Sequence, residues 1–164
     1  MTFKKSVLTL LLITALLLLS ACSSQSYRDD VKALTLTDAA KQKITVASSY
    51  DTYDASFLEF YLSDAVSLVD DSSIVYAVAA NDYTEIGVLH VSDPDNLEAV
   101  QNAVKAYLDY FKETYAPQAE QYDPSEQKKL KDASYKTYGN YVIYTIMTSE
   151  DQQILLPEIE ALLK

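Results

Sequence analysis

The sequence predicts an α+β domain: a small antiparallel sheet, made of a hairpin and a third strand, with helices packed on one face. Two β-rich runs, 73–80 and 85–91, flank a short Asn/Asp turn and predict the hairpin. A third apolar run at 141–147 predicts the last strand. Helical patterns precede, separate and follow these strands, which is the order typical of the α+β class. The length suits one domain, expected at residues 35–164.

The first 21 residues, 1–21, have the pattern of a secretory signal. Lys4 and Lys5 precede an apolar run that ends at Leu19, and no acid occurs before Asp29. This run is shorter than the roughly 20 apolar residues that a membrane-spanning helix needs. We therefore expect a cleaved signal peptide rather than an uncleaved anchor helix.

The signal ends in a motif that resembles the lipobox of bacterial lipoprotein precursors: Leu19, Ser20, Ala21 and Cys22. The resemblance implies that Cys22 receives a diacylglyceryl group and becomes the first residue of the mature protein. Two acyl chains hold a protein on a membrane without a membrane-spanning helix. The expected location is the extracytoplasmic face of the cell membrane, with residues 22–34 as a polar tether. Cys22 is the only cysteine, which excludes an intrachain disulfide.

The composition excludes several classes of ligand. The chain has 24 acids and 13 lysines and arginines, and its net charge is −11. Because the predicted signal contains two lysines and no acid, the mature charge becomes −13. Nucleic acid is excluded as a partner, because binding it requires bases that neutralise phosphates. With two glycines in the chain, a Gly-rich phosphate loop is excluded as well.

Two short helices are expected before the hairpin. The first begins near Thr37, and the second begins at Asp54 or Ser56 and runs through an aromatic segment, with a loop at 48–54 between them. The pattern of residues 63–71 does not favour a helix over a strand.

The longest helix is expected between Pro94 and Tyr115. Asp93 is the predicted N-cap, Pro94 suits the first helical position, and Pro117 marks the end. The apolar stripe predicted to face the sheet consists of Leu97, Val100, Val104, Leu108 and Phe111. The opposite, solvated side consists of Gln101, Lys105, Asp109 and Lys112.

Two further helices complete the predicted order. Asp123 and Pro124 begin a shorter helix in the same way as Asp93 and Pro94. Ser149 begins a terminal helix that Pro157 should kink or split.

Three short motifs in these elements resemble one known family. They are Glu85-Ile86-Gly87-Val88, Tyr115-Ala116-Pro117 and Gly139-Asn140-Tyr141-Val142. In this order and context they are similar to the domain-of-unknown-function 4358 family, small lipoproteins of Gram-positive anaerobic bacteria. The resemblance covers the last two thirds of the chain, and residues 48–71 match the pattern least. It implies no activity and no catalytic residue.

No catalytic residue, cofactor or metal ligand is predicted. His90 is the only histidine, and alternation places it on the strand face of Ile86 and Val88, as a half-buried structural residue. Residues 93–98 have the acids of a calcium loop but lack its glycine and alternating oxygens, so we interpret them as helix caps.

We expect a binding or protein-interaction module rather than an enzyme. The 14 tyrosines either pack at the rim of the core or form an aromatic surface for an envelope protein or glycan. One alternative is an envelope hydrolase that uses paired carboxylates about 5–9 Å apart. The other is an accessory subunit that docks a membrane transporter through an apolar patch.

Overall fold

The computed structural model describes residues 26–44, 49–53 and 55–164. Within them the chain is an α+β domain, which confirms the predicted class. Its sheet is antiparallel, with the strand order β1-β2-β3-β5-β4. The strands are β1 (Tyr50–Thr52), β2 (Asp71–Ala77), β3 (Glu85–His90), β4 (Ser134–Tyr138) and β5 (Tyr141–Ile146). The sheet thus has five strands in the described residues, where the sequence predicted three.

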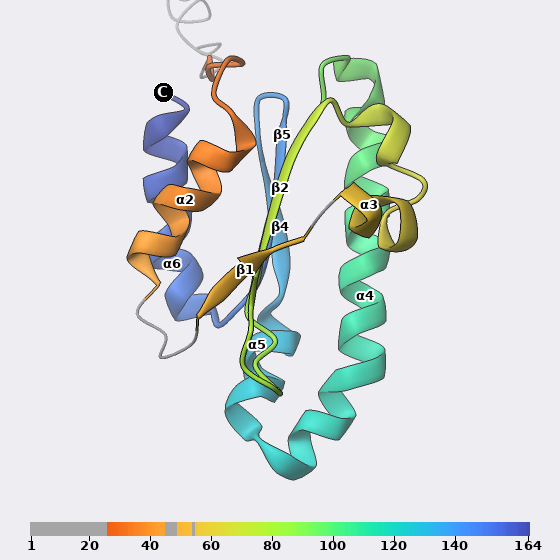
Figure 1. Cartoon of the computed structure of the whole chain (residues 1–164), viewed down its shortest axis with the longest axis vertical. Coiled ribbons are helices and arrows are strands. Elements are labelled where there is room, and N and C mark those ends of the chain that lie inside the picture. The colour runs from red at the N-terminus through yellow and green to blue at the C-terminus, as the bar shows by residue number, and fades with distance from the viewer. Residues whose placement is uncertain (1–25, 45–48, 54) are drawn as a thin grey trace, which may run out of the picture.

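Helices cover both faces of the sheet, which corrects the prediction of helices on one face (Figure 1). Helices α2 (Ala33–Lys43) and α6 (Ser149–Leu162) cover one face, and α3 (Ala55–Tyr61) and α4 (Leu97–Tyr122) cover the other. The central strands β3 and β5 are buried along their whole length. Because strands that are apolar on both sides need a cover on each side, they require two helical layers. Each layer encloses its own apolar cluster.

The two edge strands, β1 and β4, were not predicted. Both are short and carry polar side chains, so neither shows the apolar alternation that identifies a buried strand. β4 pairs with β5 through a two-residue turn at Gly139 and Asn140. Gly139 has a φ of 57°, as the first central residue of a type II′ hairpin turn requires.

A long-range contact moves the start of α2 away from its predicted position. Helix α2 begins at Ala33, one turn before Thr37, because the carboxylate of Asp71 accepts a hydrogen bond from the Ala33 N–H at 2.9 Å. Thr37 lies inside the helix, where its hydroxyl is 2.7 Å from that of Ser73. Thr148 caps α6 in place of Ser149 and accepts a hydrogen bond from the Asp151 N–H.

Two prolines lie inside helices that they were predicted to end or split. Helix α4 continues through Pro117 to Tyr122, and α6 is a single helix through Pro157. An interior proline costs a helix roughly 3 kcal/mol, so packing must offset this. Beyond Phe111 the buried stripe of α4 continues with Ala116 and Ala119, and α5 (Pro124–Asp132) folds back against α4.

The predicted register of α4 is confirmed on its buried side. Val100, Val104 and Leu108 are buried, and Leu97 and Phe111 pack at the edge of the same cluster. The solvated side is confirmed for Lys105, whereas Asp109 and Lys112 are half-buried. Gln101 is a correction, because it is half-buried and donates a hydrogen bond to Thr137 of β4. Tyr107, which lies beside the predicted stripe, is buried as well.

Candidate functional site

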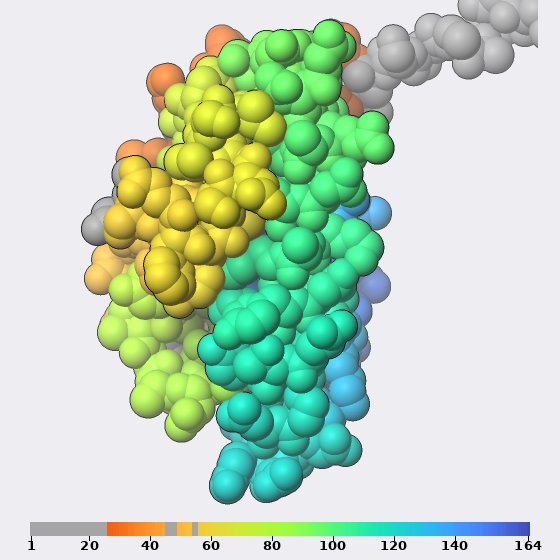
Figure 2. Space-filling view, turned by 90° about the vertical axis from the view of Figure 1, so that its right-hand side faces the viewer, coloured from red at the N-terminus to blue at the C-terminus, as the bar shows by residue number. Residues whose placement is uncertain are grey.

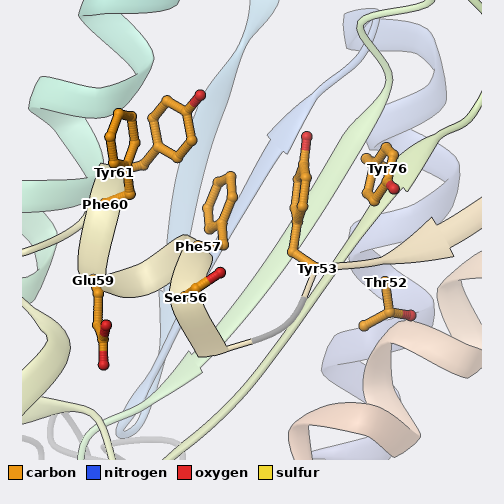
Figure 3. A pocket seen from close by; sticks show the side chains of 8 residues that line it. All are labelled: Thr52, Tyr53, Ser56, Phe57, Glu59, Phe60, Tyr61 and Tyr76. Carbon is orange, nitrogen blue, oxygen red and sulfur yellow. The ribbon is translucent and has the colours of Figure 1, made fainter.

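A groove of about 750 Å³ opens between α3 and the β1–β2 edge of the sheet. Five of the eight described residues that line it are aromatic (Figure 3). The lining residues are Thr52, Tyr53, Ser56, Phe57, Glu59, Phe60, Tyr61 and Tyr76. We call this feature the aromatic groove.

The aromatic groove is built on a row of stacked rings. The Tyr53 ring lies between those of Tyr76 and Phe57, with centroids 4.0 and 4.1 Å away and planes inclined by 16° and 17° (Figure 3). Tyr61 extends the row beyond Phe57 at 4.9 Å. The row joins the edge of the sheet to α3, so stacking fixes the position of this short helix.

Phe60 and Tyr61 form a ridge between the aromatic groove and a second hollow of about 340 Å³. The second hollow lies between α3 and α4 and is lined also by Asp64, Tyr107 and Tyr110. Figure 2 shows this face, with the yellow atoms of the α3 region against the green and teal atoms of α4. Phe60 is 77% exposed, and Tyr61 and Tyr110 are 47% and 48% exposed. Large aromatic rings this exposed on one face are typical of a binding surface.

A buried acid lies behind this surface. The Glu85 carboxylate, at the start of β3, accepts hydrogen bonds from the hydroxyls of Tyr107 at 2.9 Å and Tyr144 at 2.6 Å. Burial raises the pKa of Glu85 to about 7, and the two hydrogen bonds oppose that rise. Tyr107 also lines the second hollow and contacts Phe57 and Tyr61. It thus connects the exposed ridge to the buried carboxylate.

Gly87 makes room for this network. Gly87 pairs with Tyr144 across β3 and β5, and a Cβ on Gly87 would lie 1.9 Å from a ring carbon of Tyr144. The Tyr144 ring therefore lies directly over the Gly87 backbone, which lets its hydroxyl reach Glu85. The motif Glu85-Ile86-Gly87-Val88 thus supplies both the acid and the space for its tyrosine partner.

The raised pKa of Glu85 predicts a pH dependence of stability. The folded protein binds this proton more tightly than the unfolded chain does, so the stabilisation is complete below the ordinary glutamate pKa and is lost as the pH rises through about 7. Between pH 5 and pH 7 the free energy of unfolding should fall by about 2 kcal/mol through this group. In Glu85→Gln this part of the pH dependence should disappear, because the amide keeps an acceptor for both tyrosines without titrating.

Urea melts of the wild type and of Glu85→Gln at several pH values would measure the difference. Glu98→Gln, an exposed acid at the start of α4, is the matched control and should follow the wild type. Parallel pH profiles for the wild type and Glu85→Gln would contradict a carboxyl that is neutral in the folded protein.

His90 lies where the sequence predicted, on the α2–α6 face with Ile86 and Val88, and it contacts the Tyr141 ring. Its Nδ1 is 2.7 Å from Asp70 Oδ1 and its Nε2 is 2.8 Å from Asp29 Oδ1. Burial lowers the pKa of His90, but the hydrogen bonds to the two carboxylates outweigh it and raise the pKa overall. His90 was predicted to be half-buried, but it is 7% exposed, and its contact with Asp29 holds the segment before α2 against the sheet.

That segment belongs to the predicted tether, yet it contacts the domain from Tyr27 onward. The Tyr27 hydroxyl donates to Glu160, and its ring packs edge-on against Tyr138. The Arg28 N–H donates to the carbonyl of Leu163 at 2.7 Å. The Tyr141 hydroxyl bonds both the N–H and the carbonyl of Val31. The start of the described chain and its C-terminus consequently lie at the same end of the molecule (Figure 1).

The remaining predicted residues are placed as follows. Cys22 and the lipobox residues Leu19, Ser20 and Ala21 lie outside the described residues. Asp93, in the segment with the acids of a calcium loop, caps the 3₁₀ turn Pro94–Asn96 by accepting from the Asp95 N–H, as predicted. Across residues 26–44, 49–53 and 55–164, no three His, Cys, Asp or Glu side chains form a metal-binding group. In that same part of the chain, no helix is long and apolar enough to cross a bilayer.

Neither feature of the site was predicted as such. The signal for Glu85 was an acid at the start of a largely apolar strand, two residues before a glycine. The signal for the ridge was the run Phe57-Leu58-Glu59-Phe60-Tyr61, whose aromatic residues are too dense for one buried face of a short helix.

Comparison with known proteins gives one match. A family model described as a domain of unknown function (DUF4358) matches residues 65–147, just over half of the chain. The matched residues include Glu85, Gly87, Tyr107 and Tyr144, whereas Phe60 and the rest of α3 precede them. No curated protein and no solved structure matches the chain.

Proposed function

The chain belongs to the family described as a domain of unknown function (DUF4358), and from that premise we propose that it is a lipid-anchored binding module on the extracytoplasmic face of the cell membrane. The observation that carries the binding role is the ridge of Phe60 and Tyr61 between two hollows. Large aromatic side chains are among the residues that contribute most to the binding energy of protein interfaces. The origin implied by the resemblance, a Gram-positive anaerobe, is part of the same proposal.

The proposed anchor is Cys22. The lipobox at the end of the predicted signal supports it, and so does the strongly acidic composition. Anionic headgroups would repel a domain of this charge, so a lipid is the expected contact with the membrane.

A binding role fits the aromatic groove better than hydrolysis does. Glycoside hydrolysis requires two carboxyl groups on either side of the substrate. Of the described residues that line the aromatic groove, Glu59 is the single acid. Glu85 has the raised pKa of a general acid, but it is buried and its hydroxyl partners are tyrosines of the core. An accessory subunit that docks a transporter remains one form of the binding role.

Cys22→Ala should abolish attachment of the lipid. Without the thiol no thioether can form, so the protein should accumulate as an unprocessed precursor or leave the membrane fraction. Mass spectrometry of the wild type should find a lipidated Cys22 and no trace of residues 1–21. Ser23→Ala, the neighbouring change, should leave processing unaltered. An unmodified thiol on the wild-type protein, or a retained signal, would refute the anchor.

A further inference from the structure

We propose that the ridge and its two hollows bind a basic segment of a protein partner, with one lysine or arginine side chain on each side of the ridge. This inference rests on the proposed binding function and adds the chemistry of the ligand. The contacts would be the exposed faces of Phe60 and Tyr61 and the carboxylates of Glu59 and Asp64.

Acidic side chains lie on both sides of the ridge. Phe60 and Tyr61 line both hollows, whereas Glu59 lines only the aromatic groove and Asp64 lines only the second hollow. Each hollow thus has one acid, and neither has a lysine, arginine or histidine among its described lining residues. Two cations that straddle the ridge would each meet one carboxylate.

The surrounding sequence strengthens this charge pattern. From residue 44 to residue 104 the chain contains 11 acids and no lysine or arginine. This stretch supplies α3, the β1–β2 edge and the first turns of α4, which together build most of the face. The exposed acids on this face, Glu59 and Asp64 among them, would repel a phosphate-rich or other anionic ligand and would attract a cationic one.

The exposed rings add the second attraction. A guanidinium or ammonium group is drawn to the face of a tyrosine or phenylalanine ring, and arginine is the more frequent partner. The faces of Tyr53 are covered by Tyr76 and Phe57, so Tyr53 offers only its edge. Phe60, Tyr61 and Tyr110 retain exposed surface. A neutral glycan could also use these rings, but it would gain nothing from the acids on either side.

An extended peptide presents alternate side chains on one face, so two basic residues separated by one residue can both point toward the ridge. The probe is therefore an acetylated, amidated peptide with the core Arg-Ala-Arg between Gly/Ser flanks. The peptide is titrated into the full chain in a nonionic detergent, and isothermal titration calorimetry or NMR gives its affinity. The comparison probes are the same peptide with glutamine in place of arginine and a neutral N-acetylglucosamine tetramer.

The arginine peptide should bind at least tenfold more tightly than the glutamine peptide and should weaken as salt is raised. Glu59→Gln and Asp64→Asn should each weaken it several-fold, and Phe60→Ala should weaken it about tenfold. Matched controls are Glu120→Gln and Tyr122→Ala, exposed residues at the far end of α4. Because Phe60 is mostly exposed, its truncation should leave the thermal melt unchanged.

Equal affinity for the two peptides, or no response to Glu59→Gln and Asp64→Asn, would overturn the inference. Binding of the tetrasaccharide in preference to the arginine peptide would also overturn it, while leaving a binding module at the same ridge. If neither probe binds and Cys22 of the wild-type protein carries no lipid, the proposed function fails as well.

Discussion

Leu108→Ala should lower the free energy of unfolding by about 2–5 kcal/mol, a large share of the 5–15 kcal/mol typical of a domain. Leu108 is 3% exposed and belongs to the apolar cluster between α4 and the sheet. Truncation removes buried methyl groups and leaves a cavity that the surrounding strands and helices fill only in part.

Lys105→Ala is the control, because Lys105 lies on the same helix and is exposed. Its ion pair with Asp109 on the next turn is solvated, so the change should cost well under 1 kcal/mol. Urea melts of residues 26–164, which contain every described contact, would measure both. Equal costs for the two substitutions would contradict the helix register.

Gly87→Ala should destabilise the domain by at least about 3 kcal/mol, at the upper end of what overpacking costs. The new methyl group would overlap the Tyr144 ring, which Glu85, Tyr107 and the opposite strand hold in place. In a strand without such a neighbour, replacing glycine by alanine would instead stabilise by about 0.5–1 kcal/mol.

A double-mutant cycle separates the steric cause from other effects. In a Tyr144→Val background the space above Gly87 is free, so adding Gly87→Ala should cost less than about 1 kcal/mol or even stabilise. Chemical denaturation of the four proteins gives the coupling energy. Additive costs would show that the two residues do not compete for the same space.

The class of the fold and its central elements could be predicted because their patterns are local. Strands β3 and β5 are continuous apolar runs, and Val100, Val104 and Leu108 repeat at helical spacing. The edge strand β4 has no such pattern, because Ser134, Lys136 and Thr137 are polar and most of the strand is only half-buried. The second helical layer could not be predicted either, since one sequence does not say on which face of the sheet each helix lies.

The spacing of four tyrosines illustrates what was missed. Tyr135, Tyr138, Tyr141 and Tyr144 recur every three residues, which fits neither a helix nor one strand. In the structure these tyrosines lie at equal distances on either side of the two-residue turn between β4 and β5. They therefore form two pairs across the hairpin. Tyr138 pairs with Tyr141 on the α2–α6 face, and Tyr135 pairs with Tyr144 on the α4 face. Gly-Asn between two aromatic runs was the local signal for that hairpin.

The candidate site is formed by contacts between segments that lie far apart in the sequence. Glu85 was quoted as part of a motif, but its burial and its two tyrosine partners come from α4 and β5, far along the chain. The ridge was visible only as an aromatic-rich segment. Its flanking acids lie in two separate hollows because α4 forms the far wall of the second one.

Because the chain already contacts the domain at Tyr27, only a short linker could separate the domain from a membrane anchor. Given a lipid on Cys22, five residue steps separate the anchor from Tyr27, which is bound to Glu160 and packed on Tyr138. At about 3.6 Å per step this linker can span no more than about 18 Å. The domain would therefore search a thin layer next to the bilayer, and a partner anchored in the same membrane would meet it at a high effective concentration. An affinity too weak for capture from free solution would be sufficient there.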